Sequence, residues 1–89
     1  MIVREFVINN KSGLHARPAT LWVQTASRYQ SSIRLKKANR EVDGKSLLAI
    51  LSLGLSAGSS VEVTIDGSDE AAASGELAKL IADLAEKGE

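Results

Sequence analysis

The spacing of apolar side chains changes period along the first third of the chain, and each period predicts a different element. Residues 2–8 predict a strand whose apolar face carries Ile2, Phe6 and Ile8. Residues 16–29 switch to helical spacing, with apolar side chains at i, i+3, i+4 and i+7: Ala19, Trp22, Val23 and Ala26. Pro18 is tolerated only in the first turn of a helix, so the helix is expected to begin at His15 or Ala16.

The middle of the chain predicts a hairpin and a short helix. Residues 32–37 alternate apolar and basic side chains, as a half-exposed strand does, and residues 41–43 form a short return strand. Asn39-Arg40 is the expected turn between them. Ser46 is a good N-cap for a helix that runs to about Leu53.

The last third predicts a strand over residues 61–66, a turn at Asp66-Gly67 and a long helix capped by Ser68 or Asp69. That helix carries an apolar stripe of Leu77, Leu80, Ile81 and Leu84. The order strand–helix–strand–strand–helix–strand–helix predicts an α+β fold of one domain, residues 1–89. We expect an open-faced sandwich, in which three helices cover one face of a four-stranded, mainly antiparallel sheet.

Composition removes several classes of function. The chain has no Cys and one His, so no disulfide, thiol chemistry, metal site or cofactor is expected. Charge at Arg4 and Glu5 comes too early for a signal peptide, and the longest uncharged run, residues 46–61, is too short to span a bilayer. We therefore expect a cytoplasmic protein. No feature of the sequence indicates an obligate oligomer, so a monomer is expected. With three aromatic residues and zero net charge, nucleic-acid binding is not expected.

The segment Gly13-Leu14-His15-Ala16-Arg17-Pro18-Ala19 carries the clearest chemical signal. A histidine at a helix N-terminus is a nucleophile beside backbone N–H groups and a positive dipole end that favour phosphate. Arg17 adds a planar cation suited to phosphate oxygens, and Gly13 permits a sharp turn before the ring. On spacing alone, a histidine before a helix is more often a solvated cap residue, and a nearby arginine a surface charge. A general base is a third interpretation, but the sequence contains no recognisable triad to support it.

A second signal is the run Ser46–Leu55, in which apolar residues circle the short helix instead of lining one face. A short helix in a small domain cannot bury every side, so part of this run is expected to stay exposed as a docking patch. The alternative is that another element covers it. Ser46 is in either case a simple N-cap.

Together, these two segments resemble the HPr family, the histidine phosphocarriers of the bacterial phosphoenolpyruvate–sugar phosphotransferase system. The resemblance covers the whole chain and includes Lys45-Ser46-Leu47-Leu48 and Ser52-Leu53-Gly54-Leu55. It implies that Enzyme I transfers a phosphoryl group to Nδ1 of His15, with Arg17 stabilising it, and that the group passes to the IIA domains of sugar permeases. The protein is then a carrier and not an enzyme.

The resemblance also implies a docking surface over the first two helices, formed by Ala16, Arg17, Thr20, Gln24, Ser27, Leu47, Leu48 and Leu51. In many Gram-positive members a dedicated HPr kinase/phosphorylase modifies the serine that matches Ser46, and a catabolite-control transcription factor is a further partner. Here Leu47-Leu48-Ala49 follows the serine, where those members often have Ile-Met-Gly. His15 excludes the regulatory paralogue that has Gln at this position.

Other functions stay open at this point. A related carrier of a nitrogen-regulatory or dihydroxyacetone-kinase relay has the same chemistry, and a purely regulatory binding module has the same docking patch. The charges separate along the chain: residues 1–60 carry nine Lys and Arg against three carboxylates, and residues 61–89 carry two against eight. The resulting net charges are +6 and −6. The expected functional surface belongs to the positive part, residues 1–60, which suits a phosphoryl group and acidic partners.

Overall fold

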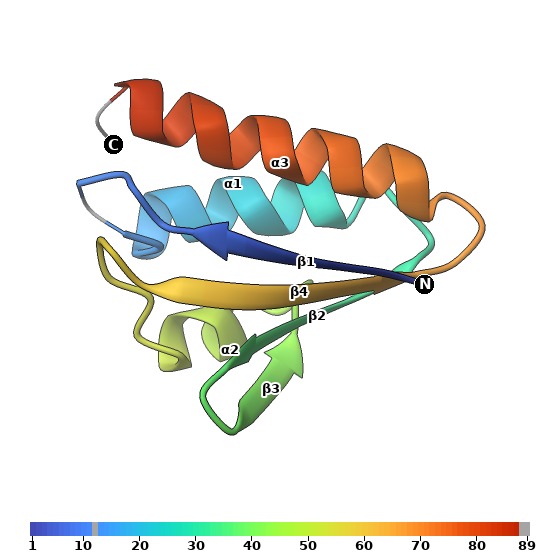
Figure 1. Cartoon of the computed structure of the whole chain (residues 1–89), viewed down its shortest axis with the longest axis horizontal. Coiled ribbons are helices and arrows are strands. Elements are labelled where there is room, and N and C mark those ends of the chain that lie inside the picture. Colours follow the sequence, from blue (N-terminus) through green and yellow to red (C-terminus); the bar gives the residue numbers. More distant parts are fainter. Residues whose placement is uncertain (12, 88–89) are drawn as a thin grey trace.

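The predicted order of elements is confirmed by the computed structural model, which describes residues 1–11 and 13–87. The elements are β1 (Ile2–Val7), α1 (Ala16–Ala26), β2 (Ser32–Lys37), β3 (Arg40–Asp43), α2 (Leu47–Ser52), β4 (Ser60–Asp66) and α3 (Glu70–Lys87). The sheet order is β1-β4-β2-β3, and each of these pairs is antiparallel. β4 therefore lies between β1 and β2, which are joined by the crossover helix α1 (Figure 1).

One face of the sheet packs against the helices and the other faces solvent. Strand alternation buries Phe6, Ile33, Leu35, Val61, Val63 and Ile65 on the helix side. α1 and α3 lie side by side over this face, α3 contacts β1 and β4, and α2 contacts β3 (Figure 1). Trp22 of α1 is fully buried, and its indole N–H donates to the Gly44 carbonyl at 3.1 Å. The helices described are each too short or too polar to cross a lipid bilayer.

Several predicted boundaries shift by one residue, and two differences have an identifiable physical reason. α1 ends at Ala26 and not near Tyr29, because Arg28 and Tyr29 donate to carbonyls only three residues back, a tighter turn that ends the helix. The turn between β2 and β3 is formed by Ala38 and Asn39, one residue earlier than expected. Ala38 has φ +55, a conformation that residues with a Cβ rarely adopt, so composition did not indicate it.

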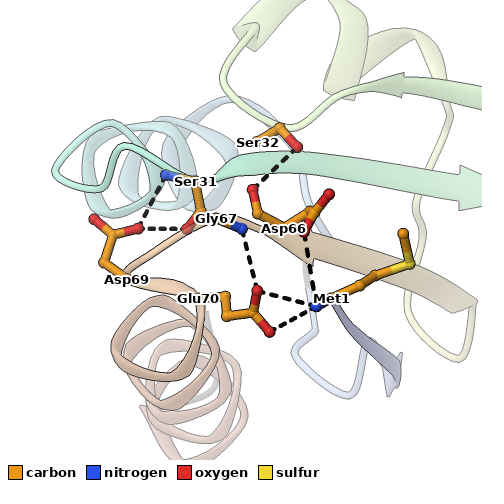
Figure 2. Close-up of polar contacts among 7 residues, drawn as sticks. All are labelled: Met1, Ser31, Ser32, Asp66, Gly67, Asp69 and Glu70. Atoms are coloured by element: carbon orange, nitrogen blue, oxygen red, sulfur yellow. Dashed lines mark hydrogen bonds and ion pairs between the residues drawn. The ribbon is translucent and has the colours of Figure 1, made fainter.

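The junction between β4 and α3 holds the loop between α1 and β2 through Asp69 (Figure 2). Asp69 stands at the start of α3 as predicted, and its carbonyl accepts the Ala73 N–H at 3.0 Å. Its carboxylate, however, accepts the backbone N–H groups of Gln30 and Ser31, at 2.8 and 2.9 Å, and the Ser31 hydroxyl. A side chain expected to cap α3 thus fixes the loop between α1 and β2.

Beside it, Glu70 joins the chain start to the same junction. Its carboxylate accepts the Gly67 N–H at 3.2 Å and pairs with the Met1 ammonium at 2.8 Å (Figure 2). The Asp66 carboxylate lies 3.7 Å from the same ammonium. The hydrogen bond to Glu70 raises the pKa of the Met1 amine, and the amine lowers the pKa of Glu70. Met1, which precedes the edge strand β1, is therefore connected to Glu70, the first residue of α3.

The bonds at Asp69 predict a pH-dependent contribution to stability. The Ser31 hydroxyl, followed by the Gln30 N–H, holds the pKa of Asp69 below its usual 3.8. A carboxyl whose folded pKa is lowered stabilises the fold above its unfolded pKa, and this contribution disappears as the pH falls through the folded pKa. Urea unfolding should show Asp69→Asn less stable than the parent at pH 7, with the difference shrinking toward pH ~2.

The matched control is Glu76→Gln, which neutralises an exposed acid of α3. It should follow the parent at every pH. A difference between Asp69→Asn and the parent that stays constant from neutral to acid pH would show that ionisation of Asp69 contributes nothing.

Candidate functional site

His15 occupies the N-cap position of α1, as the position of Pro18 predicted. Its backbone is extended (φ −81, ψ −166), and its carbonyl accepts the first helical bond, from the Ala19 N–H at 2.8 Å. Its side chain makes no capping hydrogen bond, and the residue is exposed. The backbone of His15 therefore begins the helix while its imidazole remains available at the surface.

The first turn of α1 provides the electrostatic setting of that ring. N–H groups at a helix start point out along the axis and give this end a partial positive charge. Pro18 lies buried in the first turn, where its missing N–H costs no helical hydrogen bond, and its side chain packs inward. Arg17, two residues after His15, is exposed and adds a full positive charge. Positive charge at a helix start is favourable for an anion such as phosphate.

The segment that leads into His15 is held by backbone contacts with a distant loop. The Leu14 N–H donates to the Leu55 carbonyl at 2.8 Å, and the Leu14 side chain is buried. The Asn10 side-chain amide donates to the Gly13 carbonyl at 2.6 Å, and the Gly13 N–H donates back to the Asn10 carbonyl at 3.1 Å. The loop after β1 is therefore fixed against the loop after α2.

Gly13 is required here for two independent reasons. Its φ is +63, a conformation that glycine adopts without steric cost. A Cβ at this position would lie 2.3 Å from the Leu55 carbonyl oxygen and 2.8 Å from Cα of Ser56. Sequence reasoning identified the sharp turn but missed this close packing, because nothing in the local sequence indicates contact with residues 55 and 56.

The residues expected to form the docking surface lie on α1, on its C-cap and on α2, and the two helices pack against each other. Along one side of α1, Ala16 and Gln24 are exposed and Thr20 is half-buried, and the C-cap residue Ser27 is exposed. On α2, Leu48 is 80% exposed and Leu51 is 37% exposed, whereas Leu47 is partly buried. The prediction that part of the apolar run stays uncovered is thus confirmed.

Ser46 is the N-cap of α2, as predicted. Its hydroxyl accepts the Ala49 N–H at 3.3 Å, and its backbone is extended (φ −110, ψ 113). The residue is half-buried and precedes the exposed Leu48 by two positions. Within residues 1–11 and 13–87, no group of three His, Asp or Glu side chains is arranged to hold a metal ion.

The chain is similar over most of its length to known proteins of one family. The family model described as "PTS HPr component phosphorylation site" matches residues 2–83. The phosphocarrier protein HPr of Xylella fastidiosa is 41% identical over 80 residues, 90% of each chain. The crystal structure of HPr-C-His from Thermoanaerobacter tengcongensis superposes with a TM-score of 0.92 at 44% identity, covering 97% of both chains. The crystal structure of an HPr dimer from the same organism superposes with a TM-score of 0.65 at 46% identity, covering 92% of this chain and 90% of that chain.

The two constraints on Gly13 can be separated by a matched pair of variants. Gly54 has φ +64 but open space where a Cβ would lie, so Gly54→Ala should cost only the ~1–2 kcal/mol of the left-handed conformation. Gly13→Ala should cost ~1–3 kcal/mol more, because the methyl group must displace the Leu55 and Ser56 backbone. Urea unfolding measures both. Equal losses would contradict the close packing of the two loops.

Proposed function

The chain belongs to the PTS-HPr family of phosphocarrier proteins, and from this premise we propose that His15 carries a phosphoryl group within the phosphoenolpyruvate–sugar phosphotransferase system. The group comes from phosphorylated Enzyme I and passes to the IIA domains of sugar permeases, in the bacterial cytoplasm. The observation that carries the proposal is the exposed imidazole at the start of α1, which takes no part in capping the helix.

The transfer is a substitution at phosphorus. The lone pair of a His15 ring nitrogen, Nδ1 in the family, attacks the phosphorus held by Enzyme I. A new P–N bond forms as the bond to Enzyme I breaks, and the second transfer repeats the step with His15 as the leaving group. Positive potential at the start of α1 and the Arg17 guanidinium stabilise the oxygens of the phosphoryl group.

The carrier supplies the acceptor atom, and its partners supply the rest of the catalysis. A phosphoryl group bound too tightly would not leave again, so a lightly stabilised surface site suits a carrier better than an enclosed one. The exposure of His15 supports this role, because two different partners must reach the same ring. The docking surface is formed by Ala16, Arg17, Thr20, Gln24, Ser27, Leu47, Leu48 and Leu51.

The test is incubation with Enzyme I and phosphoenolpyruvate, followed by intact-mass measurement. We expect a gain of one acid-labile phosphoryl group, and no gain in His15→Ala. Arg17→Ala should remain folded and slow the transfer on the order of tenfold, since one hydrogen bond to a charged group contributes ~1.5 kcal/mol or more. A wild-type chain that gains no phosphoryl group would refute the proposal. An unchanged rate in Arg17→Ala would remove Arg17 from the mechanism.

Regulation at Ser46 is a second part of the proposal. A kinase that phosphorylates its hydroxyl places a dianion at the start of α2, where the helix tolerates negative charge. The same charge lies close in sequence to the exposed Leu48 and disfavours the docking of an apolar partner surface there. The modified form then serves a different partner, such as a catabolite-control transcription factor.

Two variants separate the charge at position 46 from its capping role. Asp and Asn both cap helices well, so Ser46→Asp and Ser46→Asn should unfold at similar urea concentrations. Only Ser46→Asp adds charge, and we expect it to raise the carrier concentration needed for half-maximal transfer from Enzyme I by about fivefold. The same value for both variants would show that charge at this position does not control docking.

A further inference from the structure

The hairpin between β2 and β3 directs two cations onto the end of α2. Strand alternation places Lys37 on the helix side of the sheet with Ile33 and Leu35, and Arg40 is its direct partner across the hairpin. The Lys37 ammonium donates to the Gly54 carbonyl at 2.9 Å. The Arg40 guanidinium donates to the Ser52 carbonyl at 2.8 Å and to its hydroxyl at 3.1 Å.

These bonds fix the segment that supports His15. The carbonyls of the last helical turn lack partners within the helix, and cations are favourable there. Gly54 is followed by Leu55, whose carbonyl accepts the Leu14 N–H, and by Ser56, against which Gly13 packs. A continuous series of contacts therefore runs from the hairpin through residues 52–56 to the residue before His15.

The hairpin has two features that are unfavourable for its own stability. Lys37 and Arg40 are like charges in directly opposed positions, an unfavourable cross-strand pair. Ala38, in the turn between them, has φ +55, which disfavours any residue with a Cβ. Local rules are most often broken where a site has a function to serve. The bonds to Ser52 and Gly54 offset the charge repulsion. They indicate that the arrangement serves to hold the segment after α2 in place.

We propose that Lys37 and Arg40 are positioning residues for phosphoryl transfer, which hold residues 52–56 in place and through them the backbone that carries His15. The inference rests on the function proposed above. Neither cation needs to touch the phosphoryl group or the imidazole. Their effect is on the orientation of the ring when a partner is bound, and small displacements of a reacting atom slow a transfer strongly.

The test compares cations on the two faces of the sheet. Lys37→Met/Arg40→Met removes both donors, and Lys37→Arg keeps a donor at position 37. Arg34→Met/Lys36→Met removes the same charge from the open face of the sheet. Single-turnover transfer from phosphorylated Enzyme I gives the saturating rate and the half-saturating carrier concentration. Amide and ring NMR signals of Leu14 and His15 report the geometry of the loop.

We expect Lys37→Met/Arg40→Met to lower the saturating rate by about tenfold, with the half-saturating concentration within about twofold of the parent. The Leu14 and His15 signals should move in this double variant. Lys37→Arg, which keeps a donor at position 37, and Arg34→Met/Lys36→Met should both transfer at close to the parent rate. A raised half-saturating concentration with an intact rate would overturn the proposal in favour of direct contact with an acidic partner. A lower melting temperature alone would reduce the pair to a stabilising role.

The wild-type arm separates this inference from the function on which it rests. If the parent chain accepts no phosphoryl group, the proposed function fails. If the parent is phosphorylated and the double variant transfers at the parent rate, only the positioning role fails.

Discussion

The hydrogen bond from the Leu14 N–H to the Leu55 carbonyl is the constraint on which the His15 site depends. It joins the loop after β1 to the loop after α2, and Gly13 permits the approach because no Cβ stands between the two backbones. Two further bonds continue the junction: Ile8 donates to the Ser59 carbonyl at 2.8 Å and Gly58 donates to the Ile8 carbonyl at 2.7 Å. His15 is thus held by α1 on one side and by paired loops on the other, while its ring stays exposed.

The alternation of side chains along each strand determines which residues enter the core, which face solvent and which reach the end of α2. In β2 it buries Leu35 in the core, turns Lys36 to the open face and directs Lys37 to the end of α2. The charge division along the chain has a partial counterpart in space. α3 lies along β1 and β4, whereas α2 lies at the β3 edge, where it contacts the basic hairpin of β2 and β3 (Figure 1). β4, however, brings Glu62 and Asp66 of the acidic part into the middle of the sheet, next to the basic β2, so the two parts of the chain do not occupy separate sides of the molecule.

Local patterns predicted the elements well because each is determined by contacts within a few residues. Pro18 located the start of α1, Ser46 located α2, and apolar alternation located the strands. What escaped prediction depends on residues far apart in sequence. The carboxylate of Asp69 binds the loop at Ser31, and Gly13 packs against Leu55. The same holds for the site: the motif indicated the candidate nucleophile, and only the fold showed the backbone contacts that hold the preceding loop.

Amide hydrogen exchange of Leu14 tests the central claim most directly. If the bond to the Leu55 carbonyl fixes the loop that carries His15, the Leu14 N–H should exchange slowly, with protection similar to that of the Ile8 N–H, which donates in the same junction. Exchange of Leu14 at the rate of an unstructured peptide, with Ile8 still protected, would show that the loop opens independently and that the junction does not hold the site.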